Sequence, residues 1–272
     1  MNPPLSFTPS GRRPLAPGAR RAPFLFVLAL LSGVTAASPA SAQETIASDR
    51  PGIGSGSTVI SPGILQVETG LSFSRSDEID AWSLGQLFVR YGIAERVEAE
   101  LLLNSYVFVR GPDGVPGIDA DGLEDLAFGA KVRVARGERA TFSLQGLVTA
   151  RTGSSAFTTG EWYGVVNGLF DVALSDVAGL SVNAGVRPGT GDLPTVFNAN
   201  VTPGVSLGGG FGLYGGWAGS FASGGDVNWL EGGATLLATP DVQLDLNGAW
   251  SVDADAWFFG AGVAFRLGAN GG

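Results

Sequence analysis

The sequence predicts an all-β protein, a transmembrane antiparallel up-and-down β-barrel of about twelve strands. Three observations carry this prediction. Apolar and polar residues alternate along many short segments, which is the pattern of strands with one dry and one wet face. After residue 42, no apolar stretch reaches the ~20 residues that a transmembrane helix needs. The links between segments alternate between short and long, as the periplasmic turns and external loops of outer-membrane barrels do.

Residues 1–42 are expected to be a cleaved signal peptide. Four arginines precede an apolar run from Phe24 to Leu31, and Ala40-Ser41-Ala42 fits a small-residue cleavage site. A membrane anchor is the alternative, but this run is too short to cross about 30 Å of hydrocarbon. The chain contains no cysteine, which excludes disulfides and a lipidated N-terminal cysteine.

The mature chain is strongly acidic. Removing residues 1–42 takes away 4 of the 16 basic residues and none of the 25 acidic ones, so 12 basic groups remain and the net charge is −13. This balance argues against nucleic acid as a partner. Low total charge, 43 glycines and a positive mean hydropathy favour a barrel whose apolar residues face lipid over the alternative, a soluble β-fold.

Residues 43–62 do not alternate and contain two prolines and several glycines, so they are not expected to form a membrane strand. We expect this segment at the periplasmic mouth, with Asp49 and Arg50 partly inside the lumen. Together with Pro51 they are the candidate residues of an N-terminal plug.

The barrel is expected to occupy residues 63–272. In its first strand, Leu65 and Val67 share one parity while Gln66 and Glu68 share the other. The strand around Pro203 is the weakest, because proline cannot donate to a ladder. An even number of strands places both ends of the barrel in the periplasm. The expected strands are 63–75, 82–91, 96–109, 123–135, 140–151, 161–174, 179–187, 199–207, 211–221, 227–238, 241–251 and 256–267.

The expected links fall into two classes, and five tryptophans lie at strand ends next to the longer class, where aromatic rings favour a membrane–water boundary. The tight turns are 92–95, 136–139, 175–178, 208–210 and 239–241. The longer class comprises 110–122, 152–160 and 188–198, with shorter members at 76–81, 222–226 and 252–255.

The last strand ends with Gly262, Phe265 and Leu267 in a Gly-x-x-Φ-x-Φ spacing. This resembles the C-terminal signal that outer-membrane barrels present to their assembly machinery. The chain departs from that signal, since Leu267 replaces the more usual aromatic residue and five further residues follow it.

The chain contains no histidine and no cysteine. This excludes serine–histidine triads, thiolate nucleophiles and His/Cys metal sites. Catalysis by carboxylates alone is the remaining option, but the carboxylate pairs fit lumen or loop polarity better. We therefore expect no enzyme activity, no cofactor and no metal site.

Charged residues near the periplasmic strand ends are expected to face the lumen, because a charge facing lipid is costly. Across the 92–95 turn, Arg90 is expected opposite Glu98. Arg266 is expected to meet Glu68 or Gln66 across the seam that closes the barrel. The alternative is that each charge is simply hydrated. The expected charge ladder comprises Glu68, Arg90, Glu98, Glu100, Lys131, Arg133 and Arg266.

Residues 48–70 resemble the opening of a bacterial family described as a putative meta-pathway of phenol degradation protein. A departure is Leu123-Glu124, where glycine is more typical. The resemblance implies an outer-membrane barrel that passes small molecules, aromatic or apolar ones among them, and none of its motifs is catalytic. The matching motifs are Asp49-Arg50-Pro51, Ser61-Pro62-Gly63, Leu65-Gln66-Val67-Glu68, Val89-Arg90-Tyr91-Gly92-Ile93, Val97-Glu98 and the stretch from Gly122-Leu123-Glu124-Asp125-Leu126 to Lys131.

Two functions remain open at this point. One is a channel for passive passage of small organic solutes, and the other is a structural or adhesive barrel with a plugged lumen. The inward residues of the outer half are mostly small or polar, which favours an opening. The expected partners are outer-membrane lipid, the barrel assembly machinery and a small-molecule solute.

Overall fold

The structure is a computed structural model that describes residues 45–112, 115 and 117–267. The expected signal peptide, residues 1–42, lies outside the described residues. Within the described part, no helix has the length and apolar character needed to cross a bilayer. The strands are β1 Leu65–Ser76, β2 Ile79–Ala94, β3 Val97–Arg110, β4 Ala120–Leu123, β5 Ala127–Arg136, β6 Ala140–Thr149, β7 Tyr163–Ala173, β8 Ala178–Arg187, β9 Val196–Gly208, β10 Phe211–Ala222, β11 Gly225–Thr239, β12 Val242–Ser251 and β13 Ala256–Leu267.

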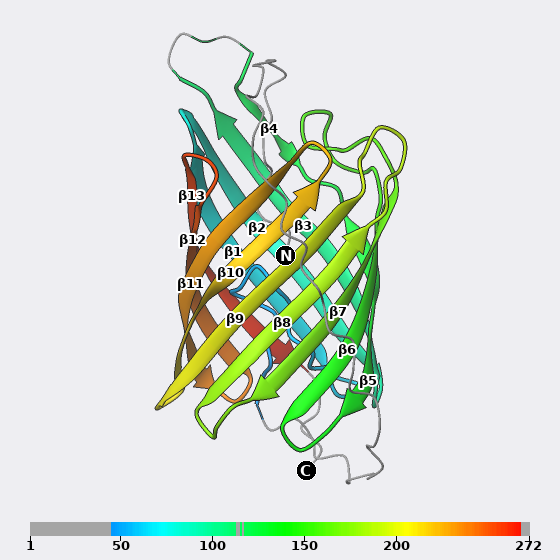
Figure 1. Ribbon diagram of the computed structural model, residues 1–272, viewed down its shortest axis with the longest axis vertical. Coiled ribbons are helices and arrows are strands. Elements are labelled where there is room, and N and C mark those ends of the chain that lie inside the picture. The colour runs from blue at the N-terminus through cyan, green and yellow to red at the C-terminus, as the bar shows by residue number, and fades with distance from the viewer. Residues whose placement is uncertain (1–44, 113–114, 116, 268–272) are drawn as a thin grey trace, which may run out of the picture.

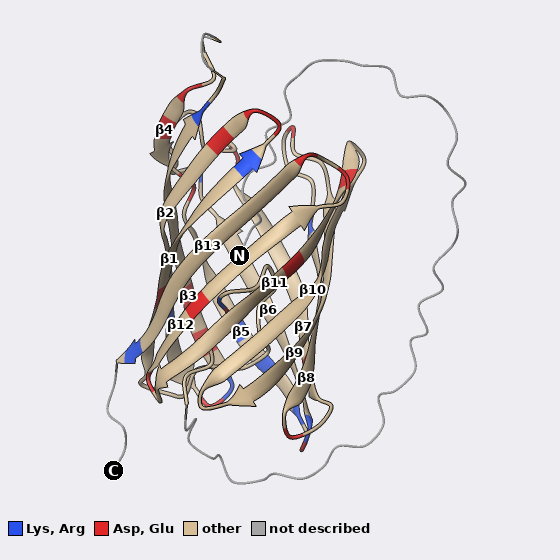
Figure 2. Cartoon of the chain, turned by 90° about the vertical axis from the view of Figure 1, so that its left-hand side faces the viewer, with Lys and Arg blue, Asp and Glu red and all other residues tan. Residues whose placement is uncertain are grey.

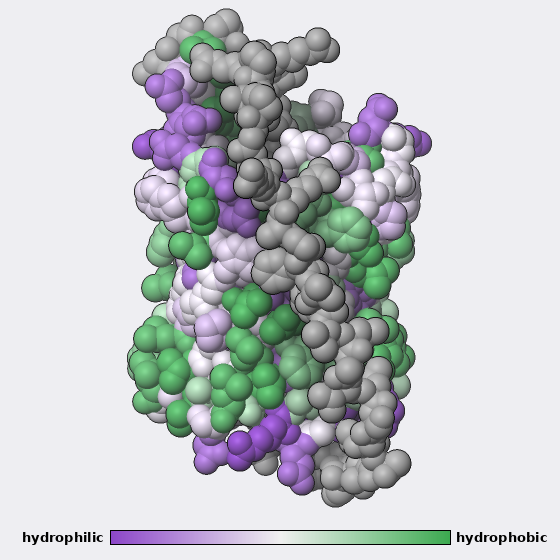
Figure 3. Space-filling model, viewed as in Figure 1, coloured by the Kyte–Doolittle hydropathy of each residue, from purple (hydrophilic) through white to green (hydrophobic). Residues whose placement is uncertain are grey.

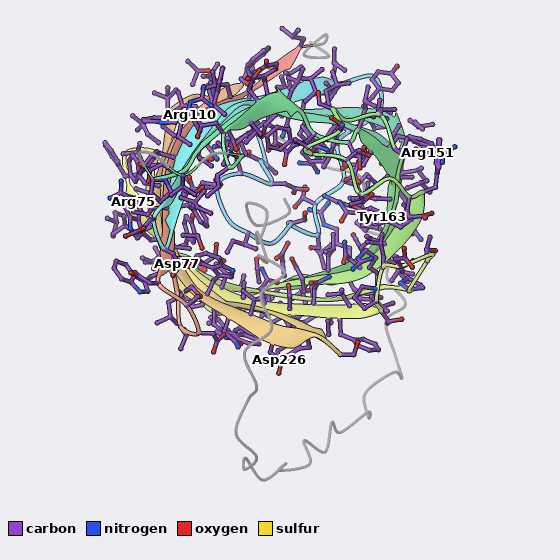
Figure 4. The ribbon with its side chains drawn as sticks, turned by 90° about the horizontal axis from the view of Figure 1, so that it is seen from above. Arg75, Asp77, Arg110, Arg151, Tyr163 and Asp226 are labelled. Atoms are coloured by element: carbon purple, nitrogen blue, oxygen red, sulfur yellow. The ribbon has the colours of Figure 1, made fainter. Side chains whose placement is uncertain are left out.

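The strands form one closed antiparallel sheet, seen from the side in Figure 1 and from above in Figure 4. β1 pairs with β13 along its whole length, from Leu65 opposite Leu267 to Ser76 opposite Ala256, which leaves no open edge. β5 pairs with the first half of β3 and β4 with its second half. The two short strands therefore occupy one strand position, and the thirteen strands form a barrel wall of 12. The prediction of an up-and-down barrel of about twelve strands is confirmed.

The strand expected at 123–135 is interrupted in the structure. Between β4 and β5, the carboxylate of Glu124 accepts the backbone N–H of Ser105 at 3.2 Å, and the carbonyl oxygen of Asp125 accepts the side-chain amide of Asn104. Asn104 itself has a positive φ of 54°, and the facing strand β2 has a bulge around Gln86, with a φ of 41°. Neighbouring strands therefore bend at the same place in the wall.

The links depart in one respect from the expected alternation of short and long. The five turns at one end are short, and the links 111–119, 150–162 and 188–195 at the other end are long. The links 77–78, 223–224 and 252–255 are as short as the turns at the other end, because β1–β2, β10–β11 and β12–β13 continue as hairpins. Arg75 and Asp80 pair across the first of these hairpins at 2.6 Å.

The outer surface carries the apolar residues that the alternation predicted. Leu101, Val132 and Leu244 point outward with 37%, 41% and 44% of their surface exposed. On the face seen in Figure 3, apolar residues form a band between two polar ends, and charged residues gather toward the rims in Figure 2. Trp82, Trp162 and Trp250 are also exposed. This band is the surface that contacts outer-membrane lipid.

The two faces of β9 can be tested with neighbouring residues. Val201 is 40% exposed on the outer face, whereas Thr202 lines a cavity inside the barrel. We expect Val201→Arg to lower the free energy of unfolding by ~2–4 kcal/mol, because it places a charge in lipid. Thr202→Arg should assemble nearly as wild type, because its charge stays in the lumen. Urea unfolding from lipid vesicles measures both, and the reverse ranking would invert the assigned faces.

Candidate functional site

The segment 45–62, here called the N-terminal plug, lies inside the barrel (Figures 1 and 4). It contains no helix and no strand longer than an isolated bridge. Asp49 and Arg50 are 6% and 3% exposed, and Ser57 and Ile60 are 0% and 1% exposed. These residues therefore sit in the lumen, deeper than a position at its mouth.

Carboxylates of the barrel wall satisfy the backbone of the plug. A chain without regular structure must still find hydrogen-bond partners for its buried N–H groups. Four acidic side chains on four different strands supply acceptors here. Glu68 accepts from the backbone N–H of Asp49 and Arg50 at 3.2 and 3.0 Å, Glu98 from Ile60 at 2.5 Å, Asp171 from Ser57 at 2.6 Å and Glu231 from Ile53 at 2.7 Å.

Arg90 on β2 connects the two ends of the plug to the wall. Its guanidinium lies 2.8 Å from Glu98 and 3.2 Å from Glu68. The same group donates to the backbone carbonyls of Ala47 at 3.0 Å and Thr58 at 2.9 Å. A guanidinium suits this position because it has five donors in a fixed plane.

Lys131 on β5 extends the same ion network. Its ammonium lies 2.8 Å from Asp49, 3.5 Å from Glu98 and 3.6 Å from Glu100. The side chains of these residues are at most 3% exposed. Buried charges of this kind are tolerated only where each has partners, so loss of one member should be costly.

Arg50 makes a second attachment between the plug and the wall. It donates to Asp245 through two nitrogens, at 3.1 and 3.2 Å, and to Gln86 at 2.7 Å. Beneath its guanidinium lie Gly70 and Gly262, which are paired in register on β1 and β13. A Cβ on Gly262 would lie 2.2 Å from Nε of Arg50. The missing side chains therefore make room for the arginine.

The structure brings together five members of the expected ladder: Glu68, Arg90, Glu98, Glu100 and Lys131. Two members lie elsewhere. Arg133 is half-buried and donates to the carbonyl of Glu95 at 2.6 Å. Arg266 faces Gln66 along the backbone, as expected, but its side chain pairs with Asp241 in the neighbouring turn.

Glu68 does not pair with Arg266, because its carboxylate already binds Arg90 and the backbone of the plug. Of the residues expected to form the assembly signal, Leu267 is 55% exposed and Phe265 is half-buried. Sequence reasoning did not identify Asp171 and Glu231 as site residues. Their inward parity was the only available signal.

Two cavities border the plug. The larger, of about 570 Å³, lies between the plug and β7–β10 and reaches the short β7–β8 turn. The smaller, of about 110 Å³, lies toward the other end of the barrel and is lined by Phe88 and Phe258. Both touch Pro51 and Gly52, so the tip of the plug separates them.

The half of the lumen toward the long links is more apolar than the half that holds the ion network. One apolar cluster contains Trp229 and Phe258 with Ile53 of the plug packed against it. Another contains Val107, Val109 and Phe157. Phe157 comes from the link 150–162, which therefore folds back against the inner wall.

Asp125 holds this link in place. Its carboxylate accepts the backbone N–H groups of Thr152 and Gly153 at 2.8 Å each and that of Thr159 at 2.9 Å. Hydrogen bonds to a carboxylate are stronger than those to a neutral acceptor, so these contacts fix the link against the inner wall.

The coupling between Arg90 and Glu98 tests the buried network. Arg90→Met should lower the free energy of unfolding by about 3–5 kcal/mol, because it leaves buried carboxylates without a partner. In a double-mutant cycle with Glu98→Gln, we expect a coupling energy above ~1 kcal/mol. The exposed pair Arg75–Asp80 is the matched control and should give less than ~1 kcal/mol. Additive losses at Arg90 and Glu98 would mean that the two charges are independent.

The barrel is similar to an outer-membrane channel from Pseudomonas putida F1, with 14% identity, a TM-score of 0.61 and coverage of 77% of this chain and 97% of that one. It is also similar to the NanC porin, with 10% identity, a TM-score of 0.53 and coverage of 75% and 100%. No curated protein matches the chain. The family model described as putative MetA-pathway of phenol degradation matches residues 48–267, and the chain belongs to this family.

Proposed function

We propose that the barrel is an outer-membrane channel for passive passage of small organic solutes. The observation that carries this proposal is the cavity of about 570 Å³ beside the plug, which leaves the lumen only partly filled. The ion pairs of the plug are with β2, β5 and β12, whereas toward β7 and β8 it makes hydrogen bonds to Asp171 and Asn183 and leaves the cavity beside them. A solute on that side keeps clear of the ion network, and it must pass the plug tip at Pro51 and Gly52 to reach the smaller cavity.

The character of the lumen supports a preference for apolar or aromatic solutes. The half toward the long links presents aromatic rings such as Phe258 and Trp229, against which such solutes can pack. The other half is polar, so a solute would leave the apolar surface for water as it passes the plug. No step in this passage requires a chemical reaction, and we propose no catalytic role.

In this proposal, residues 43–62 form a periplasmic segment inserted into the lumen and residues 63–272 form the barrel. The end with short turns faces the periplasm, as in other outer-membrane barrels. Outer-membrane lipid surrounds the apolar band. The assembly machinery would recognise the last strand through Phe265 and Leu267, while Gly262 faces Arg50.

The second candidate is a structural barrel with a permanently plugged lumen. The extent of the plug's anchoring favours it, since wall residues hold its backbone at Ala47, Arg50, Ile53, Ser57, Thr58 and Ile60. The two candidates differ in whether the wild-type barrel conducts ions and solutes.

Deleting residues 43–58 tests the channel and the role of the plug together. Arg90 and Lys131 keep Glu68, Glu98 and Glu100 after the deletion, so the barrel should still assemble. We expect the wild-type protein to conduct in planar bilayers and the deletion to raise its conductance severalfold. Deleting only 43–45 should leave conductance unchanged, because Asp49 and Arg50 remain. A silent wild type that conducts after deletion would favour the plugged barrel, and two silent proteins would refute the channel.

A further inference from the structure

We infer that the passage beside the N-terminal plug favours cationic and neutral solutes over anions, and that Asp171 and Glu231 set this selectivity. The inference rests on the proposed channel function. It assigns to two wall carboxylates a role beyond holding the plug. Both border the cavity of about 570 Å³, Asp171 directly and Glu231 behind Gly52 and Thr202.

Among the described residues around the plug, acidic side chains outnumber basic ones. The three basic groups that contact the plug are each bound by at least one carboxylate. These basic side chains are Arg50, Arg90 and Lys131, and the acidic ones are Asp49, Glu68, Glu98, Glu100, Asp171, Glu231 and Asp245. A fourth inward basic residue, Arg187 on β8, lies further toward the long links and stacks over Tyr163 at 5.3 Å, so it opposes the carboxylates there rather than beside the plug.

Asp171, on β7, has only neutral partners in the described part of the chain. Its Oδ2 accepts the backbone N–H of Ser57 at 2.6 Å and the hydroxyl of Ser57 at 2.7 Å. Its other oxygen accepts the hydroxyl of Ser181. Every ion pair within 4.0 Å that the described residues form in the lumen involves other carboxylates. The charge of Asp171 is therefore hydrogen-bonded but not neutralised.

Glu231, on β11, is in the same situation further along the plug. One oxygen accepts the backbone N–H of Ile53 at 2.7 Å, and the other accepts the hydroxyl of Thr202 at 3.0 Å. A Cβ placed on Gly52 would lie 3.7 Å from Glu231 Oε2, so little material separates this carboxylate from the cavity. Two uncompensated carboxylates thus stand beside the passage, one near Ser57 and one near Ile53.

Neutral donors stabilise a buried carboxylate without cancelling its field. A narrow lumen with low-dielectric walls focuses that field along the passage and raises the local concentration of cations. Rings of Asp and Glu give cation selectivity in other channels by the same physics. A carboxylate-bearing solute would meet like charges here, whereas a neutral or amino-bearing solute would not.

The reversal potential under a tenfold KCl gradient in planar bilayers tests the inference. We expect the wild type to be cation-selective, and the deletion of 43–58 to remain so, because both carboxylates belong to the wall. Asp171→Asn and Glu231→Gln remove the charge but keep an oxygen that can accept from the plug. Each should lower the K⁺ to Cl⁻ permeability ratio by at least about twofold, and the double variant should lower it further.

Two variants separate charge from anchoring. Ser57→Ala removes a hydroxyl donor to Asp171 but no charge, so it should keep the wild-type reversal potential. Asp226→Asn removes an exposed charge at the β10–β11 hairpin, labelled at the rim in Figure 4, and should also keep it. An anion-selective or unselective current, or an equal shift in Ser57→Ala and Asp171→Asn, would refute the inference while leaving the channel. Absence of current in both the wild type and the deletion would refute the channel itself.

Discussion

The need to satisfy the buried backbone of the N-terminal plug organises the lumen. Eighteen residues of irregular chain, 45–62, enter a closed barrel, where the ladder already uses the backbone groups of the strands. The plug's N–H groups must therefore bond to side chains of the wall. Glu68, Glu98, Asp171 and Glu231 meet that need. Arg90 and Lys131 then balance part of the charge that these acceptors bring into the lumen.

The wall is shaped to fit this arrangement. Gly70 and Gly262 face each other across the seam between the first and last strands and leave the space that Arg50 fills. The seam that closes the barrel is thus also the surface on which the plug's arginine rests. Arg50 reaches Asp245 on β12 from there, so the plug contacts both sides of the closure. Docking of the plug and closure of the barrel should stabilise each other.

The sequence predicted the contacts whose partners are near in the chain. Arg90 and Glu98 flank a tight turn and share one parity, which places them opposite each other without further information. Asp171 binds Ser57 and Glu231 binds Ile53, and these partners are 114 and 178 residues apart in the chain. The plug has no regular structure, so the sequence periodicity does not predict its path through the lumen. The parity of a residue along a strand also predicts whether its side chain faces the lumen or the lipid, but not how far along the barrel axis the side chain lies. Arg133 and Arg266 have the expected backbone positions, yet near the strand ends they find turn partners instead.

The distribution of charge along the lumen links folding to transport. An irregular plug can be held by neutral amides, as Asn183 does when it accepts the backbone N–H of Ser55 at 2.8 Å. At the other described N–H groups of the plug that wall side chains bind, the acceptors are carboxylates. A charged acceptor makes a stronger hydrogen bond than a neutral one, which favours it for holding the chain. A carboxylate that no basic residue pairs with also leaves a negative field in the lumen, as it does beside β7 and β11. Because the hollow side of the lumen is also there, the residues that fasten the plug determine the electrostatics of the path that the plug leaves open.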